Sequence, residues 1–307
     1  MSCYFPRPAF EYIEISTGEI FYKIWRPHVP SSSFPHFFKM LRQFKVPCQQ
    51  CIGCKDGYAS YWARRCEHES LYHLESSFIT LTVSDRFMDK VFPGRSLRYD
   101  PFQQFMKNFR KLTHSGIKFF MCGEYGEKLE RPHYHSIIFG WMAPASDRIV
   151  HKVTSVGTLY ISKLLSRVWP YGFSTVAPFS SACASYVAGY ITKKINGKLK
   201  PAWYGSLEPE FSECSKGIGE KYYHDFKRDL YDGRDGEVLR GGITVAPGRY
   251  YDTMLHKFDP ANFERIKFNR SLPDPVRDFM SSPSQLKKRH VVHRSRRRAG
   301  RNNFGGV

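Results

Sequence analysis

The chain has 307 residues, of which 41% are hydrophobic and 16% aromatic, and this composition excludes a largely disordered protein. No run of 18 apolar residues is present, so no membrane-spanning helix is expected. The net charge of +19 indicates a polyanionic partner, with nucleic acid preferred over a membrane surface. Eight of the basic residues lie between Gln285 and Arg301, and the rest of the chain still carries +11.

The beginning of the chain, MSCYFPRPAFEYIE, has acidic residues where a signal peptide would need an apolar segment, so we expect no export. In a reducing cytoplasm, cysteines serve as thiols or metal ligands before they serve as disulfides. Residues 1–45 contain several prolines and the run Ser31–Ser33 without a sustained period. They predict an irregular N-terminal arm.

Four cysteines follow with the spacing C-x2-C-x2-C-x11-C, namely Cys48, Cys51, Cys54 and Cys66. Thiols this close in sequence favour a structural Zn²⁺ site, but C-x2-C-x2-C also opens iron–sulfur motifs of the ferredoxin type. Because the usual continuation x3-C-P is missing, zinc is the first expectation, and uncoordinated thiols or a cluster are the alternatives. His68 is an alternative ligand. The remaining cysteines are interpreted as isolated packed thiols: Cys3, Cys122, Cys183 and Cys214.

The hydrophobic pattern becomes regular between Ser77 and Lys194. SFITLTV alternates and predicts a strand, and apolar residues at helical spacing between Pro101 and Leu112 predict a helix. IKFFMCGEYG and HYHSIIFG predict an antiparallel hairpin. The other predicted elements are a helix around 161–168, a strand at 172–176 and a helix at 181–194. The order β-α-β-β-α-β-α predicts an α+β fold with an antiparallel split-βαβ sheet of the ferredoxin or RRM type, helices on one face and an open face for a site.

His133 and His135 lie two residues apart in a predicted strand, so both imidazoles project from the same face. Glu124, at the end of the partner strand, can reach this face, and Glu127 and Glu130 compete with it as a third ligand. Two histidines and one carboxylate leave coordination positions free for substrate oxygens, as a catalytic metal site requires. The alternative interpretation is an ordinary surface strand that happens to carry two histidines.

Tyr186 and Tyr190 lie one above the other on the third predicted helix, and Lys193 and Lys194 follow one turn later. The apolar residues of this helix point in roughly the opposite direction, so the tyrosines are not part of its core stripe. A phenol with a pKa of about 10 needs a cation or a base to act as a nucleophile, and the lysines and a divalent ion are suitable. Together with the histidine pair and the basic charge, these residues predict phosphoryl transfer on a polynucleotide.

Three segments resemble, in order, the motifs of HUH endonucleases that initiate rolling-circle replication: ITLTV (79–83), RPHYHSIIFG (131–140) and YVAGYITKK (186–194). With CIGC, YWARRCEHE and GEYGEKLERPHYH, the chain is most similar to the replication initiators of the Microviridae, especially their gokushovirus branch. The three motifs cover about residues 77–194, and the cysteine segment extends the resemblance back to Cys48.

The resemblance implies that His133, His135 and Glu124 hold Mg²⁺ or Mn²⁺ against the scissile phosphate of DNA. It also implies that Tyr186 and Tyr190 are nucleophiles that form a 5′-phosphotyrosine and release a 3′-OH. One tyrosine then holds the old DNA end while the other cuts again after a full circle. The substrate implied is the single-stranded or supercoiled viral origin, in the cytoplasm of a bacterial host.

The sequence divides into an arm with the cysteine-rich segment (1–75), an endonuclease core (76–200), an accessory region of helices and loops (201–284) and a disordered basic tail (285–307). The chain lacks a Walker A sequence, so a helicase, like a DNA polymerase, is expected from the host. One alternative is a noncatalytic viral DNA-binding or packaging protein with a structural metal. A conjugative relaxase is a weaker one, because relaxases usually place the tyrosine before the histidines.

Overall fold

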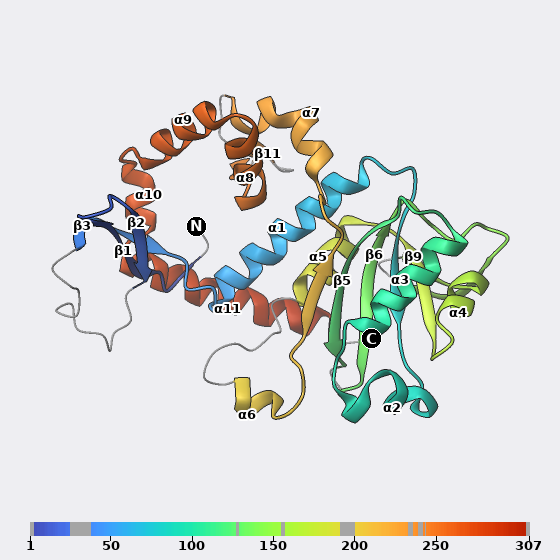
Figure 1. Ribbon diagram of the computed structural model, residues 1–307. Coiled ribbons are helices and arrows are strands. Elements are labelled where there is room, and N and C mark those ends of the chain that lie inside the picture. The colour runs from blue at the N-terminus through green and yellow to red at the C-terminus, as the bar shows by residue number, and fades with distance from the viewer. Residues whose placement is uncertain are drawn as a thin grey trace. The chain divides into compact units, whose positions relative to one another are not determined.

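The chain forms two compact units in the computed structural model, residues 58–272 and residues 1–57 with 273–307 (Figure 1). No helix among the residues that the structure describes is both long and apolar enough to span a membrane. The described residues are 3–24, 38–126, 129–154, 157–190, 200–232, 236–238, 242 and 244–304.

The larger unit is built on a seven-stranded antiparallel sheet with the strand order β10-β5-β6-β4-β9-β8-β7. Four neighbouring strands, β5-β6-β4-β9, have the order of a split βαβ unit, so the predicted α+β fold class is confirmed. The strands are β4 (Ser76–Leu81), β5 (Lys118–Tyr125), β6 (Pro132–Phe139), β7 (Arg148–Thr154), β8 (Gly157–Ser162), β9 (Ser174–Pro178) and β10 (Phe211–Cys214).

One face of this sheet is covered by α3 (Asp100–Leu112) and α4 (Lys163–Val168), the helices of the two crossovers (Figure 1). The apolar stripe predicted for α3 is buried, with Phe102 and Phe109 fully inaccessible, whereas Leu112 is exposed at the end of the helix. The short helix α2 (Met88–Val91) packs on the same core through Met88 and Val91.

The hairpin of β7 and β8 was not predicted from the sequence. Its first strand is rich in β-branched residues but is exposed at five consecutive positions, 149–153, so it lacks the alternation that marks a half-buried strand. Ile161, which we expected in the second helix, lies in β8. The helix begins at Lys163, because the Ser162 side chain caps it by accepting a hydrogen bond from the Leu165 N–H.

The opposite face of the sheet is covered by α5 (Ser181–Tyr190) and by the part of α1 (Ile52–Ser70) that belongs to this unit. We expected this face to be open, and that expectation was wrong. Strands β5 and β6 are buried on both sides, and Ile137 and Phe139 present apolar side chains to this face. Val187 of α5 is fully buried against them, since an apolar face must be removed from water.

Residues beyond 200 form a separate hydrophobic cluster around Tyr223, Tyr231 and Tyr251, in agreement with the predicted helices and loops. The strand β10, which joins the main sheet, was not predicted. The elements of this region are α6 (Lys200–Tyr204), α7 (Glu220–Tyr231), β11 (Glu237–Val238), β12 (Thr244–Val245), α8 (Arg249–Phe258) and α9 (Pro260–Ser271).

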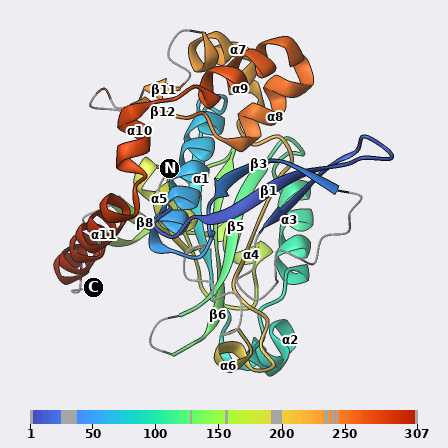
Figure 2. The ribbon, with the colours of Figure 1, turned by 90° about the vertical axis from the view of Figure 1, so that its left-hand side faces the viewer.

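The smaller unit contains a three-stranded antiparallel sheet in the order β2-β1-β3, where we expected an irregular arm (Figure 2). Its strands are β1 (Arg7–Glu14), β2 (Ile20–Ile24) and β3 (Phe38–Val46). The chain turns tightly between β1 and β2 at Gly18, whose φ of 71° suits glycine, and this turn pairs the two strands. The run Ser31–Ser33 lies outside the described residues.

The same unit contains α10 (Pro275–Met280) and α11 (Pro283–Phe304), so the expected disorder of the basic tail was wrong. Helix α11 begins at a proline, which suits a first helical turn, and no further proline interrupts it. Asp56 forms ion pairs with His293 and Arg297 and so offsets part of the positive charge of this helix. The four-segment division of the chain stays a prediction.

A single carboxylate joins three parts of the larger unit. Glu69, near the end of α1, lies 2.9 Å from Nζ of Lys118 on β5 and 2.9 Å from Nε2 of His73. It also accepts a hydrogen bond of 2.8 Å from the Gly219 N–H, just before α7. Burial raises the pKa of this carboxyl, but its hydrogen-bond donors outweigh burial and lower the pKa to about 2.

We expect Glu69→Gln to lower the free energy of unfolding at pH 7 by about 2–3 kcal/mol, because the folded state then loses its preference for the ionised carboxyl. The folded pKa is below the unfolded one, so the contribution is present above about pH 4.5 and is lost as the pH falls towards 2. Urea unfolding at several pH values checks this. A difference between the two proteins that stays constant down to pH 3 would contradict it.

Candidate active site

Three side chains with metal-ligating atoms meet on the face of the sheet that α5 covers. In the register of β5 and β6, Glu124 lies directly opposite His133, and His135 is opposite Cys122. Residues that face each other across an antiparallel pair share one side of the sheet, and so do residues two apart in a strand. The register therefore places Glu124 and both histidines on one side.

The three side chains converge on a common point. Oε1 of Glu124 lies 2.9 Å from Nε2 of His133 and 3.1 Å from Nε2 of His135. The two Nε2 atoms are 3.2 Å apart. Glu124 and His135 are buried and His133 is half-buried, so little water competes for this point.

The other ring nitrogen of each histidine is occupied. Nδ1 of His133 lies 2.9 Å from the carbonyl oxygen of Arg131, and Nδ1 of His135 lies 2.9 Å from Oγ1 of Thr80 on β4. A carbonyl only accepts, so Nδ1 of His133 carries the proton and its Nε2 presents a lone pair in the neutral ring. This arrangement orients metal-ligating histidines.

The cluster is suited to bind a cation. Burial raises the pKa of the Glu124 carboxyl, but the hydrogen bonds of His133 and His135 outweigh burial and lower that pKa to about 2. The carboxylate is therefore ionised at neutral pH and faces two nitrogen atoms. Among the described acidic residues only Glu124 completes this group; Glu130 lies in the turn, and Glu127 is outside the described residues.

Tyr134, between the two histidines, points to the other side of the sheet. It is fully buried in the core beneath α3 and α4, where its ring contacts Phe92, Phe102 and Trp169. Its hydroxyl donates a hydrogen bond to the carbonyl of Arg98. The residue between the histidines therefore anchors the strand that carries them.

Both predicted tyrosines contact this cluster from α5. The ring of Tyr190 stacks on His135 with a centroid separation of 5.2 Å and an interplanar angle of 11°. The ring of Tyr186 meets His135 edge-on at 5.4 Å, and the two tyrosine rings are 4.7 Å apart. Lys193 and Lys194 lie outside the described residues.

The two tyrosines differ in environment. Tyr186 is 51% exposed, whereas Tyr190 is 7% exposed and belongs to the apolar cluster under α5. We expected both rings to point away from the apolar stripe, and for Tyr190 this was wrong because its ring packs flat on His135. Burial, the Glu124 carboxylate and Tyr186 all raise the pKa of the Tyr190 phenol.

A second group of possible metal ligands lies in the smaller unit. The sulfur atoms of Cys3, Cys48, Cys51 and Cys54 all lie within 4.8 Å of one another. Sγ of Cys3 accepts a hydrogen bond from the Cys48 N–H, and Sγ of Cys48 accepts one from the Cys51 N–H. Burial raises the pKa of the Cys51 thiol, but the backbone N–H groups of Tyr4 and Cys54 help lower it to about 7.

The fourth thiol of this group is Cys3, whereas the sequence analysis chose Cys66. Cys66 is fully buried in the apolar cluster of the larger unit, and burial raises its pKa well above the usual value. His68, the alternative ligand, is stacked on Tyr222 and hydrogen bonded to the Tyr251 hydroxyl. Cys3 was missed because it lies 45 residues from Cys48, and no spacing rule connects them.

These features define a class: an α+β protein with a split-βαβ sheet, a Glu-His-His cluster and two tyrosines above it. Residues 76–195 match the model of the replication-associated protein ORF2 family. The chain belongs to this family of phage replication-associated proteins, and its resemblance to Microviridae initiators is confirmed.

Three curated relatives are similar over most of the chain. Replication-associated protein ORF2 of Spiroplasma virus 4 is 33% identical over 222 residues, 69% of this chain and 68% of the relative. Replication-associated protein VP4 of Bdellovibrio phage phiMH2K is 28% identical, covering 72% of this chain and 71% of the relative. Replication-associated protein ORF4 of Chlamydia phage 1 is 27% identical, covering 74% and 58%. No solved structure is a significant match.

Proposed function

We propose that this protein initiates rolling-circle replication by nicking and rejoining one strand of a viral origin through a 5′-phosphotyrosine intermediate. The observation that carries the proposal is the contact of both Tyr186 and Tyr190 with His135 of the Glu-His-His cluster. A hydroxyl nucleophile beside a cation site on a basic protein is what phosphoryl transfer to tyrosine requires.

The donor set of one carboxylate and two neutral imidazoles fits Mn²⁺ or Mg²⁺, with the nitrogen ligands suiting Mn²⁺ better. Glu124, His133 and His135 would hold the ion. When bound, it polarises the scissile phosphate as a Lewis acid. Three protein ligands leave further positions for phosphate oxygens.

In the proposed step, a tyrosine oxygen forms a bond to phosphorus and the bond from phosphorus to the 3′ oxygen breaks. The phenol proton passes to solvent, and the leaving 3′ oxygen takes up a proton. The phosphotyrosine ester conserves the energy of the broken bond, so rejoining needs no nucleotide cofactor. Lys193 and Lys194 are proposed to favour the phenolate by their positive charge.

The unequal exposure of the tyrosines suggests an order of action. Tyr186 is open to solvent and accessible to a DNA strand, whereas Tyr190 is buried against His135. We therefore assign the first cut to Tyr186 and the second, after a full circle, to Tyr190. The proposed setting is the cytoplasm of a bacterial host, with helicase and polymerase from the host.

We further propose that Cys3, Cys48, Cys51 and Cys54 hold a structural Zn²⁺. With zinc–sulfur distances of about 2.3 Å, tetrahedral ligands lie about 3.8 Å apart, and Sγ of Cys48 lies 3.9 Å from Sγ of Cys54. Backbone N–H groups directed at these sulfur atoms stabilise thiolates.

The metal assignment predicts that Glu124→Gln, His133→Ala and His135→Ala each weaken Mn²⁺ binding by at least about tenfold, because each removes a ligand. Titration calorimetry measures this, and loss of adduct formation is expected alongside. Glu130→Gln is the matched control, since Glu130 is nearby but exposed. Equal losses for Glu130→Gln and Glu124→Gln would move the third ligand into the turn.

The tyrosine assignment predicts that Tyr186→Phe lowers the initial covalent adduct with a single-stranded origin oligonucleotide more than Tyr190→Phe does. The double variant forms no adduct, since phenylalanine removes only the nucleophilic oxygen. SDS-resistant adducts in the presence of Mn²⁺ provide the readout, with peptide mass spectrometry to locate the linkage. A linkage outside the two tyrosines would refute the mechanism, and DNA binding without any adduct from the unmodified protein would favour the noncatalytic alternative.

The zinc proposal predicts about one equivalent of zinc in the purified protein, lost in Cys3→Ser but retained in Cys66→Ser. Elemental analysis distinguishes the two variants. Cys66→Ser is a demanding control because it lowers stability by placing a hydroxyl in an apolar cluster. Retention of zinc in Cys3→Ser would contradict the proposed ligand set, and brown protein absorbing at about 400 nm would indicate an iron–sulfur centre instead.

A further inference from the structure

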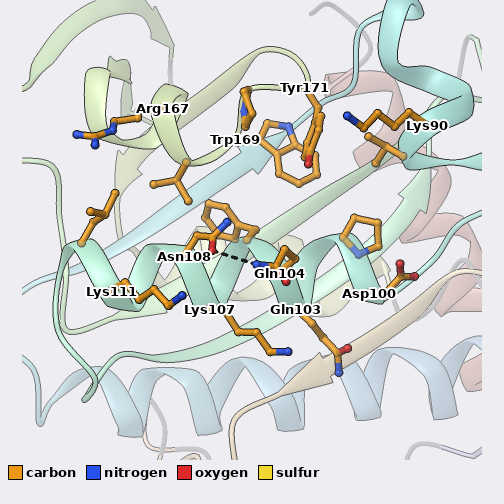
Figure 3. A pocket seen from close by; sticks show the side chains of 16 residues that line it. Lys90, Asp100, Gln103, Gln104, Lys107, Asn108, Lys111, Arg167, Trp169 and Tyr171 are labelled. Atoms are coloured by element: carbon orange, nitrogen blue, oxygen red, sulfur yellow. Dashed lines mark hydrogen bonds between the residues drawn. The ribbon is translucent and has the colours of Figure 1, made fainter.

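A basic groove of about 670 Å³ lies on the side of the sheet that carries α3 and α4 (Figure 3). Its walls come from α3, from the end of α2 and from the segment that ends α4 and leads to β9. The Glu-His-His cluster lies on the other side, because Tyr134 faces the α3 core while His133 and His135 face α5. The groove is therefore not an extension of the candidate active site.

Four cations line this groove: Lys90, Lys107, Lys111 and Arg167. All four are exposed, and none forms an ion pair with a residue in the described part of the chain. The one acidic residue of the lining, Asp100, is paired at 2.9 Å with two nitrogens of Arg98. The groove thus carries uncompensated positive charge.

Neutral hydrogen-bonding groups lie between these cations. Gln103, Gln104 and Asn108 lie on the same stretch of α3, and Gln104 donates a hydrogen bond to Asn108 that fixes both amides (Figure 3). Lys107 and Lys111 are one turn apart, about 6 Å along the helix. Lysine, arginine and amide side chains in one row are the groups that contact DNA phosphates and sugars.

We propose that this groove binds the phosphate backbone of double-stranded DNA, as a second DNA site on the face opposite to the nicking site. A duplex is favoured over a single strand, because nonspecific single-strand sites offer exposed aromatic rings on which bases stack. The aromatic residues here are committed to the protein. Trp169 is 1% exposed and donates its indole N–H to the Thr82 carbonyl, and Tyr171 packs edge-on against Phe87 and Trp169.

The site gives the protein a way to hold duplex DNA while a separated strand occupies the catalytic face. Contacts to phosphates carry no sequence information, so this site contributes affinity and orientation and not recognition of the origin. It also explains why charge is concentrated on a face of the sheet that takes no part in the chemistry.

The test compares the triple variant Lys107→Gln, Lys111→Gln and Arg167→Gln with a matched control that removes the same charges from α7 and α8. The control carries Lys227→Gln, Arg228→Gln and Lys257→Gln, all at exposed positions. Fluorescence anisotropy with a short labelled duplex and with a single strand of the same sequence measures affinity at several salt concentrations. EDTA is present throughout, so the result does not depend on nicking and is read separately from the adduct assay.

We expect the groove variant to lose at least about tenfold in duplex affinity and its salt dependence to fall by about 2.7 in slope, the value for three lost phosphate contacts. The control should retain the slope of the unmodified protein, and single-strand affinity should change less than duplex affinity. Equal losses in both variants would show a general charge effect and overturn the proposal. A loss confined to single-stranded DNA, or no loss at all, would overturn it as well.

Discussion

The pairing of β5 with β6 is the constraint on which the candidate site depends. Only the observed register sets Glu124 opposite His133 and keeps His135 on the same side. A shift by one residue would send the carboxylate and the imidazoles to opposite faces of the sheet. The buried residues of both strands fix this register, because every slip would also exchange the two apolar faces that α3 and α5 cover.

The sheet thereby separates two kinds of environment. Beneath α3 and α4 lies a dry aromatic core, which supports the strands from one side. Beneath α5 the apolar cluster ends at His135, where the packing changes from hydrocarbon to ligating atoms. Tyr190 belongs to both regions, since its ring is part of the buried cluster and also lies flat on a candidate ligand.

Sequence reasoning located the elements whose periodicity is strong. Alternation placed His133 and His135 on one face, and the spacing of Tyr186 and Tyr190 placed their rings together on one helix. The cover on the second sheet face was missed, because residues such as Phe139 alternate with Tyr134 and Ile138, which are equally apolar, and a strand buried on both faces has no polar side.

Long-range partners were beyond local patterns. Cys3 joins Cys48 only through the strand pairing of the smaller unit, and no spacing between them indicates a shared site. The hairpin of β7 and β8 hides its strand character by exposure, and α11 was read as disordered because its charge was considered before its helix-forming residues. In each case the information lies in contacts between distant segments and not in neighbouring residues.

Tyr134 has a consequence for how this site can vary during evolution. Written as a motif, the histidine pair leaves its middle position undefined, yet here that position is a fully buried aromatic whose hydroxyl reaches the Arg98 carbonyl. A smaller residue would leave a cavity directly under the strand that holds both imidazoles. Drift at this spacer position is therefore as restricted as at the ligands themselves, and aromatic exchange is the substitution that lineages of this protein can tolerate there.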